Sequence, residues 1–261
     1  MGFLSKWLPN ACGTLGPALI PPAHIAILYY FWQNYSRNVD RRFCSCSCWD
    51  TVFKGTYETG VASYKHMYFN ATTNTTKIWL LIVFGIISLY ECIKYLYKLM
   101  LQHKLRYSML SLFLLSIFPH YYAWWACINY YNDEFYDQWS HQMFFTVTEI
   151  FSTILVLNLA NKDNEVTSRK VLAISGIGVL HIMASGFDQF LANVFGGEGY
   201  AHQVVRDIGF MIPDVSHVCL PLMLLRGKRR EEPFYRDRNL RKDIVITIIL
   251  ISILFFFCSF L

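Results

Sequence analysis

Charged residues are scarce in this sequence of 261 residues. They make up 16% of the chain, whereas hydrophobic residues make up 54% and aromatic residues 17%. A water-soluble domain of this size carries more charge, because its surface must stay hydrated. Beyond Lys77, no stretch of about 50 residues lacks a long apolar block, which leaves no room for a second, soluble domain. The composition therefore argues against a soluble protein and indicates a single integral membrane domain over residues 1–261.

The sequence also lacks the short motifs of several hydrolases and metal sites. It has no G-x-S-x-G elbow, which weakens a serine hydrolase of that type. It has no H-x-x-x-H or H-E-x-x-H spacing and no C-x-x-C pair, which are common ways of holding zinc. No resemblance to a known family is evident from these residues, so a function must be argued from the distribution of polar residues.

The apolar residues gather in blocks close to the length of about 20 residues that spans a bilayer. We therefore expect an all-α fold, a polytopic bundle of about seven transmembrane helices. The first block is the weakest, because Gly13, Gly16, Pro17 and the Pro21-Pro22 pair would kink it or limit its insertion. The expected spans cover residues 12–33, 78–98, 107–129, 139–160, 170–194, 203–225 and 244–261.

Basic residues in the loops predict the orientation of the bundle. The loops after the second, fourth and sixth blocks carry 14 Lys and Arg residues, eight of them in the basic loop 226–243. The alternate loops, 130–138 and 195–202, carry none. Because basic loops stay in the cytosol, we expect the N-terminus inside and the C-terminus outside. Arg37, Arg41, Arg42, Lys54 and Lys65 oppose this orientation, but the reverse one would expel all 14 basic residues.

The predicted lumenal or extracellular loop, residues 34–77, holds all three N-glycosylation sequons, at Asn34, Asn70 and Asn74. This agrees with the orientation from charge and predicts a glycoprotein of the endoplasmic reticulum, another endomembrane or the plasma membrane. Such compartments permit disulfides, for which the candidates are Cys44, Cys46, Cys48 and Cys127. A zinc knot and palmitoylation of a cytosolic loop are the alternatives for the three clustered cysteines.

Four successive predicted spans each bring one ionisable residue to a similar depth near the middle of the bilayer. These residues are His120, Glu149, His181 and Asp214. A second set, His141, Asp188 and Asp207, lies nearer the lumen. Because a charge that faces lipid costs several kcal/mol, we expect all seven to face the interior of the bundle and to line a polar cavity open to the lumen.

Prolines accompany two of these ionisable residues, since Pro119 precedes His120 and Pro213 precedes Asp214. A proline inside a span frees a backbone carbonyl one turn earlier. Broken helices beside charges in the middle of the membrane are typical of transporter binding sites. The pattern therefore predicts interrupted helices next to the polar cavity.

Three functions fit these patterns, and the residues leave the choice among them open. The first is transport or binding of a small polar solute, an ion or a lipid head group. The second is a membrane-embedded lipid hydrolase or transferase with zinc or another divalent metal at His120, Glu149, His181 and Asp214. The third is a non-catalytic assembly or adaptor protein with membrane-protein partners. The polar residues could also serve packing alone.

Nucleic acid is not an expected partner, despite the net charge of +5. The basic residues lie in short loops between apolar blocks, and the basic loop also contains Glu231 and Glu232. This loop fits a segment that flanks the membrane and is attracted to anionic lipid. The lipid bilayer is thus the expected partner of these charges.

Overall fold

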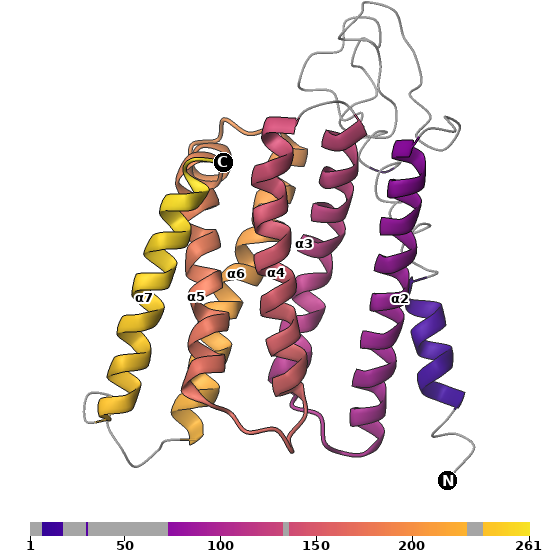
Figure 1. Cartoon of the computed structure of the whole chain (residues 1–261), viewed down its shortest axis with the longest axis vertical. Helices are drawn as coiled ribbons and strands as arrows, with labels where there is room; N and C mark the ends of the chain where they lie inside the picture. The colour runs from indigo at the N-terminus through magenta and orange to yellow at the C-terminus, as the bar shows by residue number, and fades with distance from the viewer. Residues whose placement is uncertain (1–6, 18–29, 31–72, 133–135, 229–236) are drawn as a thin grey trace, which may run out of the picture. The chain divides into compact units, whose positions relative to one another are not determined.

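The computed structural model describes residues 7–17, 30, 73–132, 136–228 and 237–261 (Figure 1). Within these ranges the secondary structure is helical, apart from one isolated β-bridge between Leu105 and Asn161. The expectation of an all-α protein is confirmed. The predicted loop 34–77 lies outside the described residues, except for its last five residues.

Each predicted span from the second onward corresponds to a helix or to a pair of joined helices. The first span, 12–33, lies mostly outside the described residues, and residues 7–17 form a helix there. The others are α2 (Thr73–Leu101), α3 (Tyr107–Asn132), α4 (Tyr136–Ala160), α5 (Ser168–Ser185) with the π-helix η2 (Gly186–Phe195), α6 (Ala201–Lys228) and α7 (Arg238–Cys258).

Two of the described helices are long and apolar enough to cross a membrane by themselves. They are Trp139–Ala160 in α4 and Ala201–Lys228, which is α6. The helices Ser168–Ser185 and Gln189–Phe195 would make a third if they form one span, bent by 68°. Seven transmembrane spans are therefore not confirmed and stay a prediction.

The chain divides into two compact units, of which the first runs to Lys98 and includes Tyr200–His202. In the first unit, residues 7–17 pack against α2 through small side chains. A Cβ atom on Gly13 would lie 3.1 Å from the ring and from the carbonyl oxygen of Tyr90. The Tyr90 hydroxyl donates a hydrogen bond to Asn10 Oδ1 at 3.3 Å. Glycine at position 13 thus permits this close approach.

The second unit contains α3 to α7, apart from the first two residues of α6, and holds the residues of the candidate site described below. Within it α3 packs along α4, α4 packs against α5, and α5 packs against α7 (Figure 1). Glycines set two of the approaches of α5, since a Cβ atom on Gly176 would lie 2.8 Å from Ile251 of α7. Small residues let helices approach closely in this way in membrane bundles.

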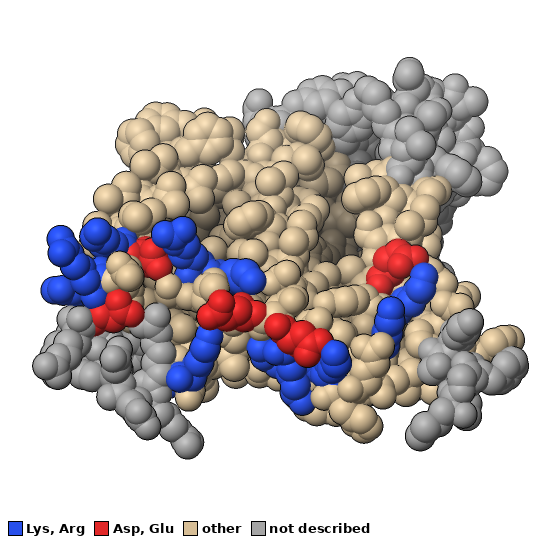
Figure 2. Space-filling model, turned by 60° about the horizontal axis from the view of Figure 1, so that its bottom comes forward, with Lys and Arg blue, Asp and Glu red and all other residues tan. Residues whose placement is uncertain are grey.

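Two linkers are joined at the basic end of the second unit. Arg106 precedes α3, and its guanidinium donates to four backbone carbonyls, one in the last turn of α4 and three in the linker after it, at 2.7 to 3.0 Å. These acceptors belong to Leu159, Asn161, Lys162 and Asn164. Figure 2 shows Lys and Arg side chains, with acidic ones between them, gathered at this end. Arg106 thus fastens the linker before α3 to the linker before α5.

Large apolar side chains cover the outward faces of several helices. Along α7, Ile246, Ile249 and Ile253 are each more than half exposed. On α4, Val147 and Ile154 are exposed to a similar degree. Contiguous apolar surface of this kind marks an interaction site in proteins. Together with the two helices of sufficient length, this surface is compatible with an integral membrane protein.

The helices are not interrupted at the prolines, contrary to the expectation from the sequence. The helix α3 continues through Pro119, and α6 continues through Pro213 and Pro221. One proline removes only one backbone hydrogen bond, and neighbouring groups in a bundle can compensate for it. The break instead follows Ser185, where α5 gives way to η2.

Candidate metal centre

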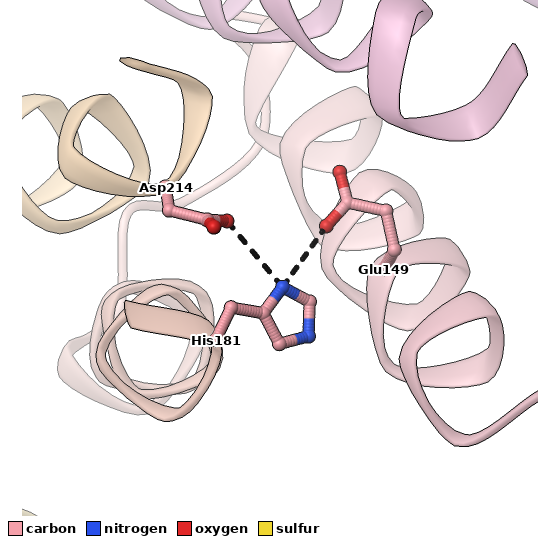
Figure 3. Close-up of side chains that lie close together, drawn as sticks. All are labelled: Glu149, His181 and Asp214. Atoms are coloured by element: carbon pink, nitrogen blue, oxygen red, sulfur yellow. Dashed lines mark ion pairs between the residues drawn. The ribbon is translucent and has the colours of Figure 1, made fainter. Parts of the chain in front are cut away.

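Three of the four residues predicted to share one depth meet inside the second unit. Glu149 comes from α4, His181 from α5 and Asp214 from α6. Figure 3 shows both carboxylates directed at the same nitrogen of His181. The distances from His181 Nδ1 are 3.6 Å to Glu149 Oε2 and 3.4 Å to Asp214 Oδ1. All three side chains are buried, and we call them the central cluster.

A glycine brings two of the three helices together at this position. Gly178 lies one turn before His181 on α5, and a Cβ atom there would lie 2.8 Å from the backbone oxygen of Asp214. Because real Cβ atoms are almost never that close to another heavy atom, only glycine permits this spacing of α5 and α6. On the next turn down, Ser175 Oγ donates to Val218 O at 3.3 Å. The cluster therefore depends on backbone contact as well as on its own side chains.

Thr148 contacts the second ring nitrogen of His181, Nε2. The Thr148 hydroxyl lies 3.0 Å from the carbonyl oxygens of Phe144 and Phe145 and can donate its only hydrogen to them. Its oxygen is then free to accept from His181 Nε2, which is 2.8 Å away. In a neutral imidazole only one nitrogen bears hydrogen. In a neutral ring that donates from Nε2, the lone pair on Nδ1 faces the two carboxylates, whereas in a protonated ring Nδ1 donates towards them.

When His181 is neutral, its Nδ1 and the two carboxylate oxygens facing it are three acceptor atoms in a buried space. Such a group requires either a shared proton or a bound cation between its members. A charge-assisted hydrogen bond from an imidazolium to a carboxylate is about 2.7–2.9 Å long, shorter than both distances here. Two ligands of a tetrahedral zinc ion, each about 2.1 Å from it, lie about 3.4 Å apart. The distances of 3.4 and 3.6 Å are compatible with ligands that share an ion and with ion pairs between a protonated His181 and the two carboxylates.

Two buried polar atoms of α4 lack a hydrogen-bond partner. They are Glu149 Oε1 and Ser152 Oγ, which lie one helical turn apart. In Figure 3 the second oxygen of Glu149 points away from His181. Buried polar groups of folded proteins are nearly always satisfied by protein or by ordered water. These two atoms therefore mark a place for water or a ligand beside the central cluster.

Two hydrogen-bonded pairs involving α3 lie close to the cluster. His217, one turn after Asp214, lies 2.8 Å through Nδ1 from Pro213 O and 3.2 Å through Nε2 from Ser116 Oγ. Since a carbonyl only accepts, Nδ1 of His217 donates and Nε2 of the neutral ring accepts from the serine. His120 bonds Thr153 at 2.7 Å and interacts electrostatically with Glu149. His120 is thus a neighbour of the central cluster, and its Nε2 is hydrogen-bonded to Thr153.

The predicted lumenal set does not join this cluster. His141 is exposed on α4, and its ring packs against Phe145 at 4.9 Å. Asp207 is buried in a separate network, where it accepts hydrogen bonds from Asn193 and Arg206 at 2.7 Å each. The side chain of Asp188, in η2, lies outside the described residues. The expected helical spacing from His181 to Asp188 does not apply, because α5 ends at Ser185 and gives way to the π-helix η2.

The predicted cavity open to the lumen stays a prediction. A hollow of about 680 Å³ lies at the basic end instead, and none of the central cluster lines it. Its lining includes Arg106, Lys162, Glu165, Met223 and Lys228.

The remaining predicted sites lie mainly where the structure is not described. Cys44, Cys46, Cys48, Asn34 and Asn70 are outside the described residues. Cys127 is a buried free thiol, 3.7 Å from Met143 Sδ. Asn74 lies in the first turn of α2, which begins five residues earlier than predicted. The glycosylation and disulfide predictions are not tested by these residues.

Sequence reasoning missed Ser116 and Thr153, which hold His217 and His120. Ser116 lies four residues before His120, on the same face of α3, and this spacing was an available signal. Hydroxyl residues in helices commonly bond their own backbone. The sequence therefore gave no reason to expect that Thr153 would bond a histidine of another helix. Small residues on the fifth span, Gly178 among them, indicated close helix packing, but the sequence did not show that Gly178 meets the backbone at Asp214.

Comparison with known proteins identifies the family of this chain. The model of a family of unknown function (DUF8801) matches residues 6–261, and the chain belongs to this family. No curated protein and no solved structure matches the chain.

Proposed function

We propose that the protein is a polytopic membrane protein that binds a divalent metal ion at Glu149, His181 and Asp214. The observation that carries the proposal is the convergence of two carboxylates on His181 Nδ1, at 3.4 and 3.6 Å. The ligand atoms of the three residues all lie within 4.8 Å of one another.

Zinc fits this set of ligands best. One imidazole and two carboxylates supply nitrogen and oxygen donors, which zinc accepts, and three protein ligands leave one position open. Thr148 supplies the support that metal-bound histidines usually have, because it receives the proton on the second ring nitrogen. The two negative carboxylates and one neutral imidazole also balance the charge of a divalent ion in a buried place.

The membrane arrangement forms part of the proposal. We place the chain in the bilayer with seven spans, its N-terminus in the cytosol and its C-terminus outside. Support comes from the apolar outward faces of α4 and α7 and from the concentration of basic residues at one end of the second unit. The three sequons favour a compartment of the secretory pathway or the cell surface.

The experiment is metal analysis of the detergent-purified protein after incubation with Zn²⁺ and gel filtration. We expect about one zinc ion per wild-type chain. His181→Ala and Asp214→Asn each remove a ligand, so bound zinc should fall at least about tenfold. Inductively coupled plasma mass spectrometry gives the metal-to-protein ratio.

Matched substitutions control for effects on folding. His141→Ala and Asp163→Asn remove an exposed imidazole and an exposed carboxylate elsewhere in the same unit, and both should retain zinc. A wild-type protein that elutes as a single species and holds neither zinc nor another divalent metal would overturn the proposal.

Transport is a second candidate, favoured by the line of acidic residues on α6. Asp207 and Asp214 are seven residues apart on one face of this helix, and both are buried. A proton or metal ion could pass between two such groups, and histidine changes its charge near neutral pH. Proteoliposomes with a zinc-sensitive or pH-sensitive dye inside test this candidate. A leak equal to that of empty vesicles would refute it.

A further inference from the structure

The central cluster provides three ligands, which is the number found in catalytic rather than structural zinc sites. Structural zinc is normally enclosed by four protein ligands, whereas catalytic zinc keeps a position for water or substrate. Glu149, His181 and Asp214 are the one group of metal-ligating residues that the described part of the chain brings together in this way. The fourth position of the proposed ion is therefore available to water.

The two polar atoms without partners indicate where that water lies. Glu149 holds the cluster through Oε2, and its Oε1 is buried without a hydrogen bond. A water on the ion can donate to the free oxygen of a carboxylate that binds the same ion. Ser152 Oγ, one turn further along α4, is also buried and unbonded and can hold a second hydrogen bond of this water. A metal, a bound water and a carboxylate that can take its proton are the parts of a hydrolytic centre.

The surroundings of the cluster indicate an apolar substrate. Ile150 and Val215 directly follow Glu149 and Asp214, and both are exposed on the outward faces of α4 and α6. In the proposed bilayer these faces contact acyl chains, which places lipid next to the two helices that carry Glu149 and Asp214.

We infer that the centre hydrolyses the ester or amide bond of a membrane lipid, with Glu149 as the base and Ser152 as a residue that positions the water. This inference rests on the metal binding proposed above. The oxygen of water bonds to the carbonyl carbon of the lipid, and Glu149 Oε1 takes one proton from that water. The bond from the carbonyl carbon to the alcohol oxygen or amide nitrogen breaks, and the proton passes to the leaving group. The products are a fatty acid and an alcohol or amine, with no oxidant or reductant.

The test uses the full chain with zinc, in mixed micelles and in water enriched in ¹⁸O. The probes are phosphatidylcholine, diacylglycerol and ceramide with labelled acyl chains, and the readout is labelled fatty acid by mass spectrometry. The wild type should release fatty acid that contains one ¹⁸O atom from at least one probe. Glu149→Gln should lower the rate at least about 100-fold, because it removes the base and a metal ligand.

Ser152→Ala separates hydrolysis from metal binding. It should retain zinc and the melting temperature of the wild type, while kcat falls about tenfold and KM changes little. Ser252→Ala and Glu165→Gln are the matched controls, because both side chains are exposed and distant in sequence from the cluster, and both should keep the wild-type rate.

The outcomes distinguish this inference from the proposed function. Zinc in the wild type without release of fatty acid from any of the three probes overturns hydrolysis and leaves metal binding standing. Absence of any divalent metal overturns both. A Ser152→Ala variant with an unchanged kcat overturns the assigned position of the water.

Discussion

Thr148 orients the ring of His181 through the bond from Nε2, and its own hydrogen is directed to the backbone of α4. Thr148→Val keeps the shape of the side chain but removes the acceptor, so the ring can turn and Nδ1 can take the proton. We expect the affinity for zinc to fall about 10–100-fold. Competition with a fluorescent zinc chelator measures this affinity.

Thr146→Val is the matched control for Thr148→Val. Thr146 also bonds the backbone of α4, at Gln142 O, but it lies near Cys127 rather than His181. Its affinity for zinc should equal that of the wild type. If both valine variants behave alike, the assignment of the proton on His181 is wrong.

At the residue scale, the sequence was most informative about depth. Glu149, His181 and Asp214 were predicted to lie at one level, and the structure brings them together. Depth could not show how each helix is rotated, so it did not reveal that Nε2 of His120 bonds Thr153. The bond between Ser116 and His217 joins residues 101 positions apart, so no local pattern could reveal it.

At the scale of elements, the hydrogen bonds of Arg106 hold together the two linkers at the basic end. Arg106→Lys keeps the charge but replaces a planar fork by one point donor, which cannot reach four carbonyls. We expect a loss of about 2 kcal/mol in the free energy of unfolding, or ~4–8 °C in Tm. Thermal unfolding in detergent measures the change.

Arg169→Lys provides the comparison for Arg106→Lys. Arg169 has a side chain 85% exposed and one ion pair, with Asp243 at 3.3 Å. An exposed pair of this kind contributes little, so Tm should stay within about 2 °C of the wild type. Equal shifts for the two variants would contradict the role given to Arg106.

Asp243 makes the attachment of α7 sensitive to acid. The Ser168 hydroxyl donates to it at 2.6 Å and, with the charge of Arg169, lowers the pKa of the Asp243 carboxyl below its ordinary value of 3.8. A carboxyl with a lowered pKa in the folded state stabilises the fold above pH 3.8, and this contribution is lost as the pH falls through the lowered pKa. The difference in Tm between wild type and Asp243→Asn should therefore be constant above about pH 5 and shrink towards pH 3.

Ser168→Ala gives an independent test of the same contact, because it removes the largest cause of the lowered pKa. Its difference in Tm from the wild type should follow the same course with pH. A difference that grows as the pH falls would mean that Asp243 does not stabilise α7 in its charged form.

The existence and order of the helices were predictable because apolar blocks of fixed length are a strong signal. The ends of the helices were less predictable. The helix α2 begins five residues before the predicted span, and α7 begins six residues before its predicted span and includes Asp243. The change from α5 to η2 was not predicted. A π-helix depends on packing around it, and Gly186 alone does not distinguish a break from a close contact.

For the whole molecule, the proposed orientation makes a prediction about access from the two sides of the membrane. Glu198 and Asp163 are exposed in linkers that follow η2 and α4. In sealed vesicles of known orientation, a maleimide that cannot cross membranes should label Glu198→Cys from the lumenal side and Asp163→Cys from the cytosolic side. Labelling of both variants from one side would rule out the predicted topology.

The sequence predicted the helices, but it did not predict which helices pack against each other. Periodicity and charge indicate which residues avoid lipid, but they do not show which helices are neighbours. The close approach of α5 and α6 depends on Gly178 meeting the backbone at Asp214, a contact across 36 positions.

The distribution of the three proposed ligands along the chain has a consequence for biosynthesis. The first is at position 149 and the last at 214, each on a different helix. A chain whose synthesis has reached the end of α5 holds only two of them, with a carboxylate and an imidazole inserted and no ion between them. If these residues bind a metal ion as proposed, loading can be complete only after α6 has joined α4 and α5, so a nascent chain stalled before that step lacks one of the three ligands.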